Sequence, residues 1–386
     1  MTASPPDDFA GFGLAAPLLD ALERAGHARP TPIQSRAIPP LMAGRDVVVM
    51  SQTGSGKTAA YALPLLHRLA TDSAPRRPGA PRALILAPTR ELASQIAGVC
   101  RTLGRALPLR TRIACGGLPR EGQIKALEEG ADLLVATPGR LVELLEGGHL
   151  VLDDVGTLVL DEADRLIEGD LLVAMGRIAP YLPERRQTVL CSATQPPVLR
   201  DLAGRLLHSP ERIEIEAPTV TPRRIRQRVI FAQREEKPDL VARAAADFLH
   251  ESAGRDTPGR IIAFVRTRAE AEKFAAILRR AGIPCETLHG DKTQGARSKA
   301  LDAVRQGRAR VLVATDLAAR GLDLDSIGLI INTDVPDAPE TYIHRIGRTA
   351  RAGKSGAALT LCAPEERTAL RRIEQQIGYR ITVMEP

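Results

Sequence analysis

Residues 47–58 read Val-Val-Val-Met-Ser-Gln-Thr-Gly-Ser-Gly-Lys-Thr, an apolar run that leads into two glycines and a lysine. The apolar run predicts a buried strand, and the residues after it are compatible with a helix. Gly54 and Gly56 allow the backbone to turn its amides towards phosphate oxygens, and the helix adds its positive N-terminal end. Lys57 can neutralise the terminal phosphates, and Thr58 offers a hydroxyl to Mg²⁺. The stretch therefore predicts a strand–loop–helix unit that binds a nucleotide.

Further apolar runs along the chain alternate with longer segments of helical character. Continuous apolar strands separated by helices are typical of a parallel sheet covered on both faces. Ligands of such sheets bind beyond the carboxyl ends of the strands, which is where polar residues collect in this sequence. The expected strands are Asp46–Met50, Arg82–Ala87, Thr111–Cys115, Asp132–Ala136, Thr157–Leu160, Thr188–Cys191, Arg228–Ala232, Arg260–Val265, Pro284–Leu288, Arg310–Ala314, Gly328–Asn332 and Ala357–Leu361.

The two series of strands are separated by Glu211–Arg226, a segment with two prolines and no clear period. Such a composition is typical of an interdomain linker. We therefore expect one domain over residues 1–212, a linker over 213–226 and a second domain over 227–386. The alternative is a surface loop within one large domain, but a single sheet of about a dozen strands would be unusually wide.

A second motif, Asp-Glu-Ala-Asp at residues 161–164, follows the expected strand Thr157–Leu160. Buried carboxylates are costly unless they are paired or bind a metal. Asp161 is placed to hold Mg²⁺ through water, and Glu162 to orient and deprotonate an attacking water. Taken by itself, a strand followed by acidic residues is also compatible with a solvated helix cap. Together with the glycine-rich loop, the motif predicts phosphoryl transfer.

Composition and charge limit the classes of partner. The chain has 386 residues, of which 44% are hydrophobic, and its formal net charge of +7 suits a polyanion. Tryptophan is absent and aromatic residues total 3%, so we expect amides and arginines, and few aromatic platforms, to hold a nucleic acid. No stretch reaches the ~20 apolar residues of a membrane span. The five cysteines form no CxxC pair, so we expect a cytoplasmic protein without a zinc or disulfide framework.

With these two motifs joined by others in a fixed order, the chain resembles the DEAD-box RNA helicases of helicase superfamily two, as a minimal bacterial member. The likeness runs from about Phe9 to the end of the second domain. It implies an α/β fold with two tandem RecA-like domains, each a mostly parallel sheet flanked by helices. It also implies ATP and Mg²⁺ as cofactors.

The resemblance assigns residues to ATP binding and hydrolysis. The catalytic residues would be Lys57, Asp161, Glu162, Arg348 and Arg351, of which the two arginines would reach the γ-phosphate from the second domain. Gln34 would pair with adenine, and Phe9 would stack on the base, although a core aromatic is the alternative for Phe9. ATP would contact Phe9, Thr31, Gln34, Gln52, Thr53, Gly54, Ser55, Gly56, Lys57, Thr58 and Asp323, and Mg²⁺ would be held by Thr58 and Asp161.

The same resemblance assigns residues to RNA and to coupling between the domains. Glycines allow close approach to a sugar–phosphate chain, and arginine and threonine donate to phosphate. The RNA contacts would be Pro88, Thr89, Arg90, Gly117, Thr137, Gly139, Arg140, Gly290, Arg297 and Thr315, and the coupling residues would be Asp164, Ser192, Thr194 and His344. Taken alone, the basic segment around Arg348 is also compatible with a solvated helix.

The expected function is RNA-stimulated ATP hydrolysis coupled to local, non-processive unwinding of short RNA duplexes or to remodelling of ribonucleoproteins. An ATP-gated RNA clamp with little unwinding is the alternative, because the same motifs serve both activities. A DNA translocase of the superfamily is a further rival, which the Gln34 motif disfavours. The expected partners are RNA, read with low sequence specificity, and ribosomal or degradosome-type ribonucleoproteins. We expect a monomer with no membrane association.

Overall fold

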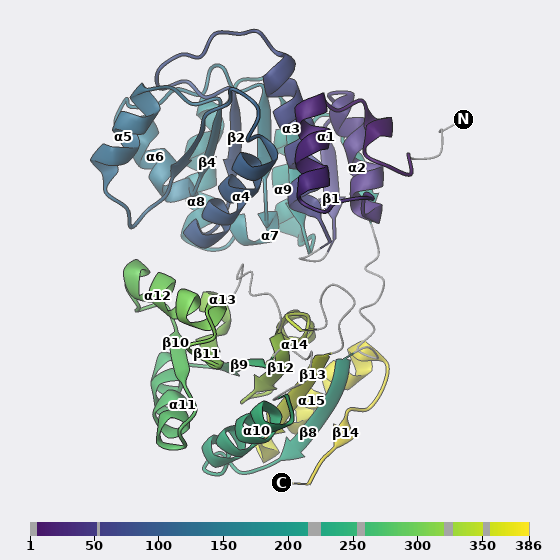
Figure 1. Cartoon of the computed structure of the whole chain (residues 1–386), viewed down its shortest axis with the longest axis vertical. Helices are drawn as coiled ribbons and strands as arrows, with labels where there is room; N and C mark the ends of the chain where they lie inside the picture. The colour runs from purple at the N-terminus through teal and green to yellow at the C-terminus, as the bar shows by residue number, and fades with distance from the viewer. Residues whose placement is uncertain are drawn as a thin grey trace. The chain divides into compact units, whose positions relative to one another are not determined.

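The computed structural model describes residues 6–51, 55–214, 225–252, 259–319, 327–349 and 356–385. The chain divides into two compact units, Met1–Ala217 and Pro218–Pro386. In each unit, helices cover both faces of a central sheet (Figure 1). This is the α/β fold of two sheets that the sequence predicts, and the two separate sheets exclude the alternative of one wide sheet.

The first unit contains a sheet of seven parallel strands in the order β3-β4-β2-β5-β6-β1-β7. The strands are β1 (Val47–Met50), β2 (Ala83–Leu86), β3 (Thr111–Ala114), β4 (Leu133–Ala136), β5 (Thr157–Leu160), β6 (Gln187–Ser192) and β7 (Glu211–Glu214). Because all seven run in one direction, their carboxyl ends meet along one edge, where ligands of such sheets bind.

Helices bury apolar side chains against both faces of the first sheet. One face packs on α1 (Ala16–Arg24), α2 (Pro32–Met42), α3 (Lys57–Thr71) and α4 (Arg90–Leu103). The other face packs mainly on α5 (Arg120–Glu128), α6 (Pro138–Glu146), α7 (Ala163–Leu166), α8 (Asp170–Ile178) and α9 (Pro197–Leu206). Short 3₁₀ segments lie at η1 (Ala10–Phe12) and η2 (Ala179–Tyr181). These two apolar layers fix the strand ends that carry the polar loops.

The second unit repeats the arrangement, with seven parallel strands in the order β10-β11-β9-β12-β13-β8-β14. The strands are β8 (Ile225–Phe231), β9 (Arg260–Val265), β10 (Cys285–Leu288), β11 (Val311–Thr315), β12 (Ile327–Asn332), β13 (Gly356–Cys362) and β14 (Thr382–Val383). In both sheets the first strand of the unit lies beside the edge strand. β8 therefore takes the place in the second sheet that β1 has in the first.

The helices of the second unit also lie on both faces. One core layer includes α10 (Lys237–Ser252) and α11 (Arg268–Arg280), and the other includes α12 (Gln294–Arg305), α13 (Asp316–Ala319), α14 (Pro339–Ile346) and α15 (Arg367–Ile377). The 3₁₀ segment η5 (Pro364–Glu366) precedes α15.

The predicted linker over residues 213–226 is wrong at both ends. Glu211–Glu214 forms β7, which pairs with β1, and β8 begins at Ile225. In β7 only Ile213 is buried, because an edge strand buries only part of its surface in the core. The other three residues of β7 are charged, so a search for continuous apolar runs does not predict this strand. The two-residue β14 was also missed. Residues 215–224 lie outside the described part of the chain.

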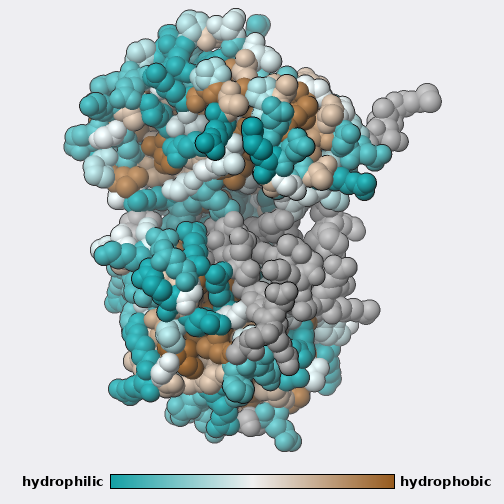
Figure 2. Space-filling view, in the orientation of Figure 1, coloured by the Kyte–Doolittle hydropathy of each residue, from teal (hydrophilic) through white to brown (hydrophobic). Residues whose placement is uncertain are grey.

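The surface of the first unit is mostly hydrophilic on the face seen in Figure 2, with hydrophobic residues in small separate areas. Such a distribution is ordinary for a globular unit. Within the described ranges, every helix is either too short or too polar to span a membrane.

Candidate functional site

The turn between β1 and α3 depends on a glycine. Gly56 has φ +97°, and a Cβ atom at this position would lie 2.7 Å from Nε2 of Gln34 and 2.9 Å from Oγ1 of Thr31. Those side chains hold the turn: the Thr31 hydroxyl donates to the carbonyl of Ser55 at 2.9 Å, and Gln34 donates to that of Gly56 at 3.2 Å. The start of α2 is thereby attached to the loop. Gln52, Thr53 and Gly54 lie outside the described residues.

Lys57 and Asp161 are buried beside each other at the ends of β1 and β5, with exposures of 7% and 3%. The Lys57 ammonium donates to the carbonyl of Ser51. The hydroxyl of Tyr61 donates to Oδ2 of Asp161 at 2.8 Å, and the amide of Glu162 donates to Oδ1 at 2.9 Å. Burial raises the pKa of the Asp161 carboxyl, while the Lys57 charge and the Tyr61 hydrogen bond oppose that rise. The arrangement can place a cation and a carboxylate around a phosphate group.

Glu162 has a left-handed backbone, with φ 48° and ψ 52°. This conformation is uncommon for residues other than glycine, and it is often retained at functional positions. The Glu162 carboxylate accepts from Nη1 of Arg165 at 2.6 Å, and both side chains are mostly buried. The side chain is therefore held in one orientation beside Asp161.

Asp164 is bound to the loop after β6. Its carboxylate accepts from the amide and the hydroxyl of Thr194, at 3.0 and 2.9 Å. The Ser192 hydroxyl donates to the carbonyl of Thr194 at 2.7 Å and accepts from the amide of Asp164 at 3.2 Å. The predicted coupling residues Asp164, Ser192 and Thr194 thus form one hydrogen-bonded unit across the adjacent strands β5 and β6.

Phe9 and Gln34 are the two residues expected to contact the adenine base of ATP. Phe9 is 5% exposed and packs edge-on against Phe12 in the core, with ring centroids 6.2 Å apart. This placement agrees with the alternative of a core aromatic and leaves little ring surface for a base. The Gln34 carboxamide accepts from the amide of Thr31 at 2.8 Å, but each of its polar atoms retains capacity for a second partner.

The loops after β2, β3 and β4 form a second group at the same sheet edge. Arg90 donates to the carbonyl of Gly117 at 3.0 Å, which joins the loops after β2 and β3. Arg140 donates to the carbonyl of Leu118 at 3.3 Å and pairs with Glu143 at 2.8 Å. Thr89 and Thr137 precede α4 and α6 as their N-caps, Gly139 is exposed, and Pro88 is buried. The sheet order places this group beside the β5 loop, because β2 pairs with β5.

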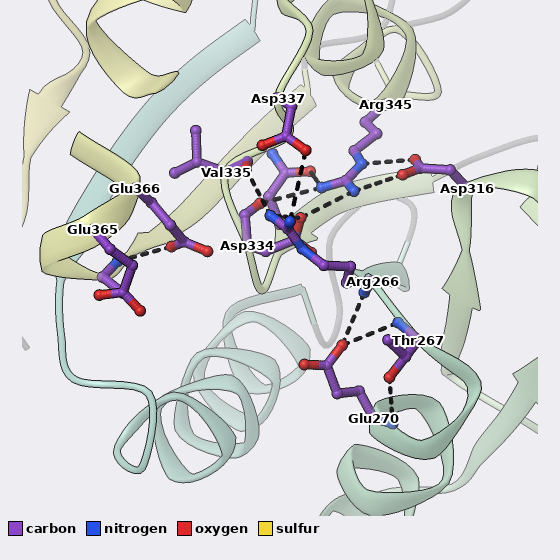
Figure 3. A network of polar contacts seen from close by, with 12 residues as sticks. Arg266, Thr267, Glu270, Asp316, Asp334, Val335, Asp337, Arg345, Glu365 and Glu366 are labelled. Atoms are coloured by element: carbon purple, nitrogen blue, oxygen red, sulfur yellow. Dashed lines mark hydrogen bonds and ion pairs between the residues drawn. The ribbon is translucent and has the colours of Figure 1, made fainter. Parts of the chain in front are cut away.

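A buried arginine organises the second unit (Figure 3). Arg345, on α14, is 3% exposed and donates twice to Asp316 at 2.7 Å, with a further contact to Asp334 at 3.4 Å. Its guanidinium also lies 5.2 Å from the ring centroid of Phe264. Burial alone would lower the pKa of Arg345, but the Asp316 and Asp334 carboxylates raise it. The network connects α14 to the ends of β9, β11 and β12.

The other predicted residues of the second unit lie around this network. Arg297 donates to the carbonyl of Ala318 at 3.4 Å, just beyond Thr315 at the end of β11. Gly290 follows β10 and is exposed, and His344 lies on α14, also exposed. Arg348 is half-buried in the turn after α14. Asp323 and Arg351 lie outside the described residues.

At the place in the second sheet that corresponds to Lys57, the chain has another lysine. Lys237 is the first residue of α10, which follows β8 as α3 follows β1. Its ammonium pairs with the Glu366 carboxylate at 2.7 Å, and both side chains are at most 10% exposed. The Glu366 carboxylate therefore neutralises the Lys237 ammonium, the group that would otherwise compensate the charge of a phosphate.

Tyr61 and Arg345 were missed as functional candidates. Tyr61 lies four residues after Lys57 on α3, and residues four apart share one helix face, so its position near Asp161 had a local signal. For Arg345, the sequence signal was Asp316 and Asp334, the acidic residues that follow the apolar strands β11 and β12. A buried arginine needs such partners, but only the fold shows that the two strand ends are adjacent.

Comparison with known proteins identifies the two units. Residues 31–202 match the family model described as DEAD/DEAH box helicase, and residues 242–353 match the helicase conserved C-terminal domain. The chain is 36% identical to the DEAD-box ATP-dependent RNA helicase CshA of Geobacillus kaustophilus, over 98% of this chain and 78% of that protein. It is 39% identical to the ATP-dependent RNA helicase DbpA of Escherichia coli, over 95% and 78%.

Solved structures give the same result. The structure of S. cerevisiae Dbp5 bound to RNA and ADP BeF3 superposes with a TM-score of 0.86 at 30% identity, covering 98% of this chain and 96% of that one. Mss116p bound to ssRNA and AMP-PNP superposes with a TM-score of 0.82 at 27% identity, over 98% and 78%.

The contacts around Gly56 generate a stability prediction. Replacing Gly56 by Ala forces a left-handed alanine against Gln34 and Thr31, so we expect a loss of about 1–3 kcal/mol in the free energy of unfolding. Gly122→Ala is the matched control, since Gly122 lies within α5 with nothing within 4 Å of its Cβ position. Chemical denaturation measures both variants. Equal stability of the two would contradict the role of the Gly56 turn.

Proposed function

The chain belongs to the DEAD-box family of ATP-dependent RNA helicases, and from that premise we propose that it uses RNA-stimulated ATP hydrolysis for local, non-processive separation of short RNA duplexes. The observation that carries the proposal is the layout of the first sheet. The Lys57 and Asp161 loops lie at the same edge as the loops after β2, β3 and β4, and the two groups meet where β2 pairs with β5. Two ligands bound at this edge would contact adjacent loops.

We assign the phosphate chemistry to the residues around Lys57. Lys57 compensates negative charge on the terminal phosphates, and Ser55 and Gly56 turn the backbone towards them. Glu162, held by Arg165, orients the attacking water and accepts its proton. Gln34 selects adenine through its carboxamide, with Thr31 holding the glycine turn. The proposed residues Gln52, Thr53 and Gly54 complete the loop in sequence.

The donors near the loop fit Mg²⁺. Asp161 presents a buried carboxylate whose oxygens each accept one hydrogen bond and can accept another. Thr58, a half-buried residue with a hydroxyl group, follows Lys57. No group of three His, Cys, Asp or Glu side chains that could hold a metal occurs in the described ranges, but Mg²⁺ commonly uses one or two carboxylates together with substrate phosphates. We propose that Thr58 and Asp161 hold it, the latter through water, and that the ion neutralises phosphate charge.

We propose that the second unit supplies the arginines that act on the γ-phosphate of ATP bound by the first unit. The buried Lys237–Glu366 pair argues against a second phosphate site at the corresponding strand. The second unit carries Arg348 and Arg351, and an arginine finger raises the rate of phosphoryl transfer about 10³–10⁵-fold. Asp323 would bind the ribose of ATP. Hydrolysis would then be slow until ATP and RNA draw the units together, so each ligand should tighten binding of the other.

We propose that RNA contacts come from both units. In the first, Arg90, Gly117 and the Thr137–Arg140 loop form one group at the sheet edge. In the second, Gly290, Arg297 and Thr315 lie at the ends of β10 and β11. Asp164, Ser192, Thr194 and His344 would transmit nucleotide state between the units. Contacts to phosphate and 2′-hydroxyl would favour RNA over DNA with low sequence specificity.

An ATP-gated clamp remains the second candidate, because the same residues would close on RNA without separating strands. Our proposal also includes a monomeric, cytoplasmic protein that acts on ribosomal or degradosome-type ribonucleoproteins.

Glu162→Gln should keep ATP binding and lose turnover. The amide can still accept from Arg165 but cannot take a proton, so we expect ATP hydrolysis to fall about 10²–10⁴-fold. Binding of a fluorescent ATP analogue and phosphate release measure the two effects. Glu128→Gln, at an exposed position on α5, is the control. Turnover at the wild-type rate in Glu162→Gln would end the proposed role.

Arg348→Ala should reduce hydrolysis far more than ATP affinity. A finger acts on charge that develops in the transition state, so we expect kcat to fall about 10³-fold or more while affinity changes less than about tenfold. Arg372→Ala, an exposed arginine of α15, is the control. Comparable losses of affinity and rate would count against a finger.

Strand separation discriminates the helicase from the clamp. With ATP, we expect a short RNA duplex to separate before the protein dissociates, and RNA to stimulate hydrolysis more than DNA of the same sequence. Gel analysis of a labelled strand and phosphate release measure both quantities. An intact duplex in a long-lived complex would favour the clamp, and equal stimulation by DNA would contradict the RNA preference.

A further inference from the structure

The second unit has a pocket of about 780 Å³ between α15 and the edge of the sheet at β8 and β14. Its floor consists of Val229, Leu370 and Ile381, each at most 4% exposed. A smaller pocket of about 270 Å³ adjoins it and shares Phe231 and Arg367 with it. In Figure 1, α15 and β14 lie on the other side of the unit from α12 and α13.

The pocket exists because the edge strand is short. β14 pairs only with Arg228 and Val229 of β8, and one further hydrogen bond joins the Met384 amide to the carbonyl of Val229. The end of β8 therefore has no neighbouring strand on that side among the described residues. Phe231, its last residue, is 38% exposed, and Val383 of β14 is 60% exposed. Large apolar side chains thus line an open entrance.

The rim of the pocket is basic. Arg367 and Arg371 lie one turn apart on α15, and Arg380 faces the pocket from the turn before β14. All three are exposed, and no ion pair of theirs is found within the described ranges. Glu374 is the acidic residue in the lining, and its carboxylate accepts from the amide of Ile381 at 2.9 Å. The rim therefore presents cationic groups that are available to a ligand.

The aromatic groups of the pocket are already fixed. The Arg367 guanidinium lies 5.0 Å from the ring centroid of Phe231. The hydroxyl of Tyr379 accepts from Gln227 at 2.6 Å, and the carboxamide of Gln227 accepts from Tyr342 at 2.8 Å. The walls are therefore preformed, which lowers the entropic cost of binding.

We propose that this pocket binds an extended acidic segment of a partner protein. Its carboxylates would pair with Arg367, Arg371 and Arg380, and an apolar side chain would enter the pocket. The outer edge of β14 offers backbone groups to an extended chain, as in β-strand addition. The opposite charges of rim and segment supply orientation.

RNA fits this surface less well than a peptide. The aliphatic floor cannot pair with phosphate, and the one exposed ring, Phe231, is already stacked by Arg367. The proposed RNA contacts follow β10 and β11. Four strand spacings separate β11 from β8, or roughly 19 Å at about 4.8 Å each. The pocket is thus separate from the RNA-binding loops of this unit.

The test selects random peptides displayed on phage against the full chain, then measures binding of the enriched peptides by fluorescence polarisation. We expect enrichment of acidic residues around an apolar one. Arg371→Glu and Arg380→Glu should each weaken binding about tenfold, since each removes a charged partner. Arg372→Glu, the neighbouring exposed arginine outside the pocket lining, should bind the peptides as the wild type does.

Two further measurements distinguish a peptide-binding surface from an RNA-binding surface. A benzophenone-labelled enriched peptide should crosslink within Arg367–Val383 of the wild type, and polyuridine should bind wild type and variants alike. Enrichment without acidic residues, equal binding to Arg371→Glu and the wild type, or equal loss in Arg372→Glu would overturn the proposal. A loss of polyuridine affinity in Arg371→Glu and Arg380→Glu that matches the peptide loss would identify an RNA surface instead, and would also overturn it.

Discussion

The burial of Lys57 and Asp161 beyond the carboxyl ends of β1 and β5, the two strands that flank β6, is the constraint around which the first unit is built. Removing a charge from water costs several kcal/mol unless partners replace the lost hydration. Here the partners are a backbone carbonyl for Lys57 and the Tyr61 hydroxyl and Glu162 amide for Asp161. Each partner comes from an element that the sheet or α3 holds in place. A phosphate bound as we propose would meet charged groups that the fold already holds in place.

The two units show how one sheet topology can carry different chemistry. Both have seven parallel strands in the same relative order, and both begin a helix with lysine after the corresponding strand. In the first unit a glycine turn precedes Lys57, whereas in the second Lys237 is neutralised by Glu366. The second unit instead buries Arg345 among acids at three strand ends. The same fold therefore places different charge partners at the corresponding lysines of the two units.

Most of the fold could be predicted from local sequence. Of the fourteen strands among the described residues, twelve lie within three residues of their predicted bounds, because strands buried on both faces are continuous apolar runs. β7 and β14 were missed, since an edge strand buries little surface and its sequence can be polar. β7 also lies within the stretch expected to be a linker, where its alternation was obscured by the prolines that follow.

The sequence by itself determined the motifs, their order and the nucleotide loop, since each depends on residues that are neighbours in the chain. Only the tertiary structure decided which motifs meet. Hydrogen bonds join Asp164 to Thr194 and Arg90 to Gly117, and parallel strand pairing brings those distant segments together. It also decided that Phe9 lies in the core and that a basic pocket opens beside β14. Burial and strand adjacency depend on how the whole unit packs, and a local sequence pattern does not determine that packing.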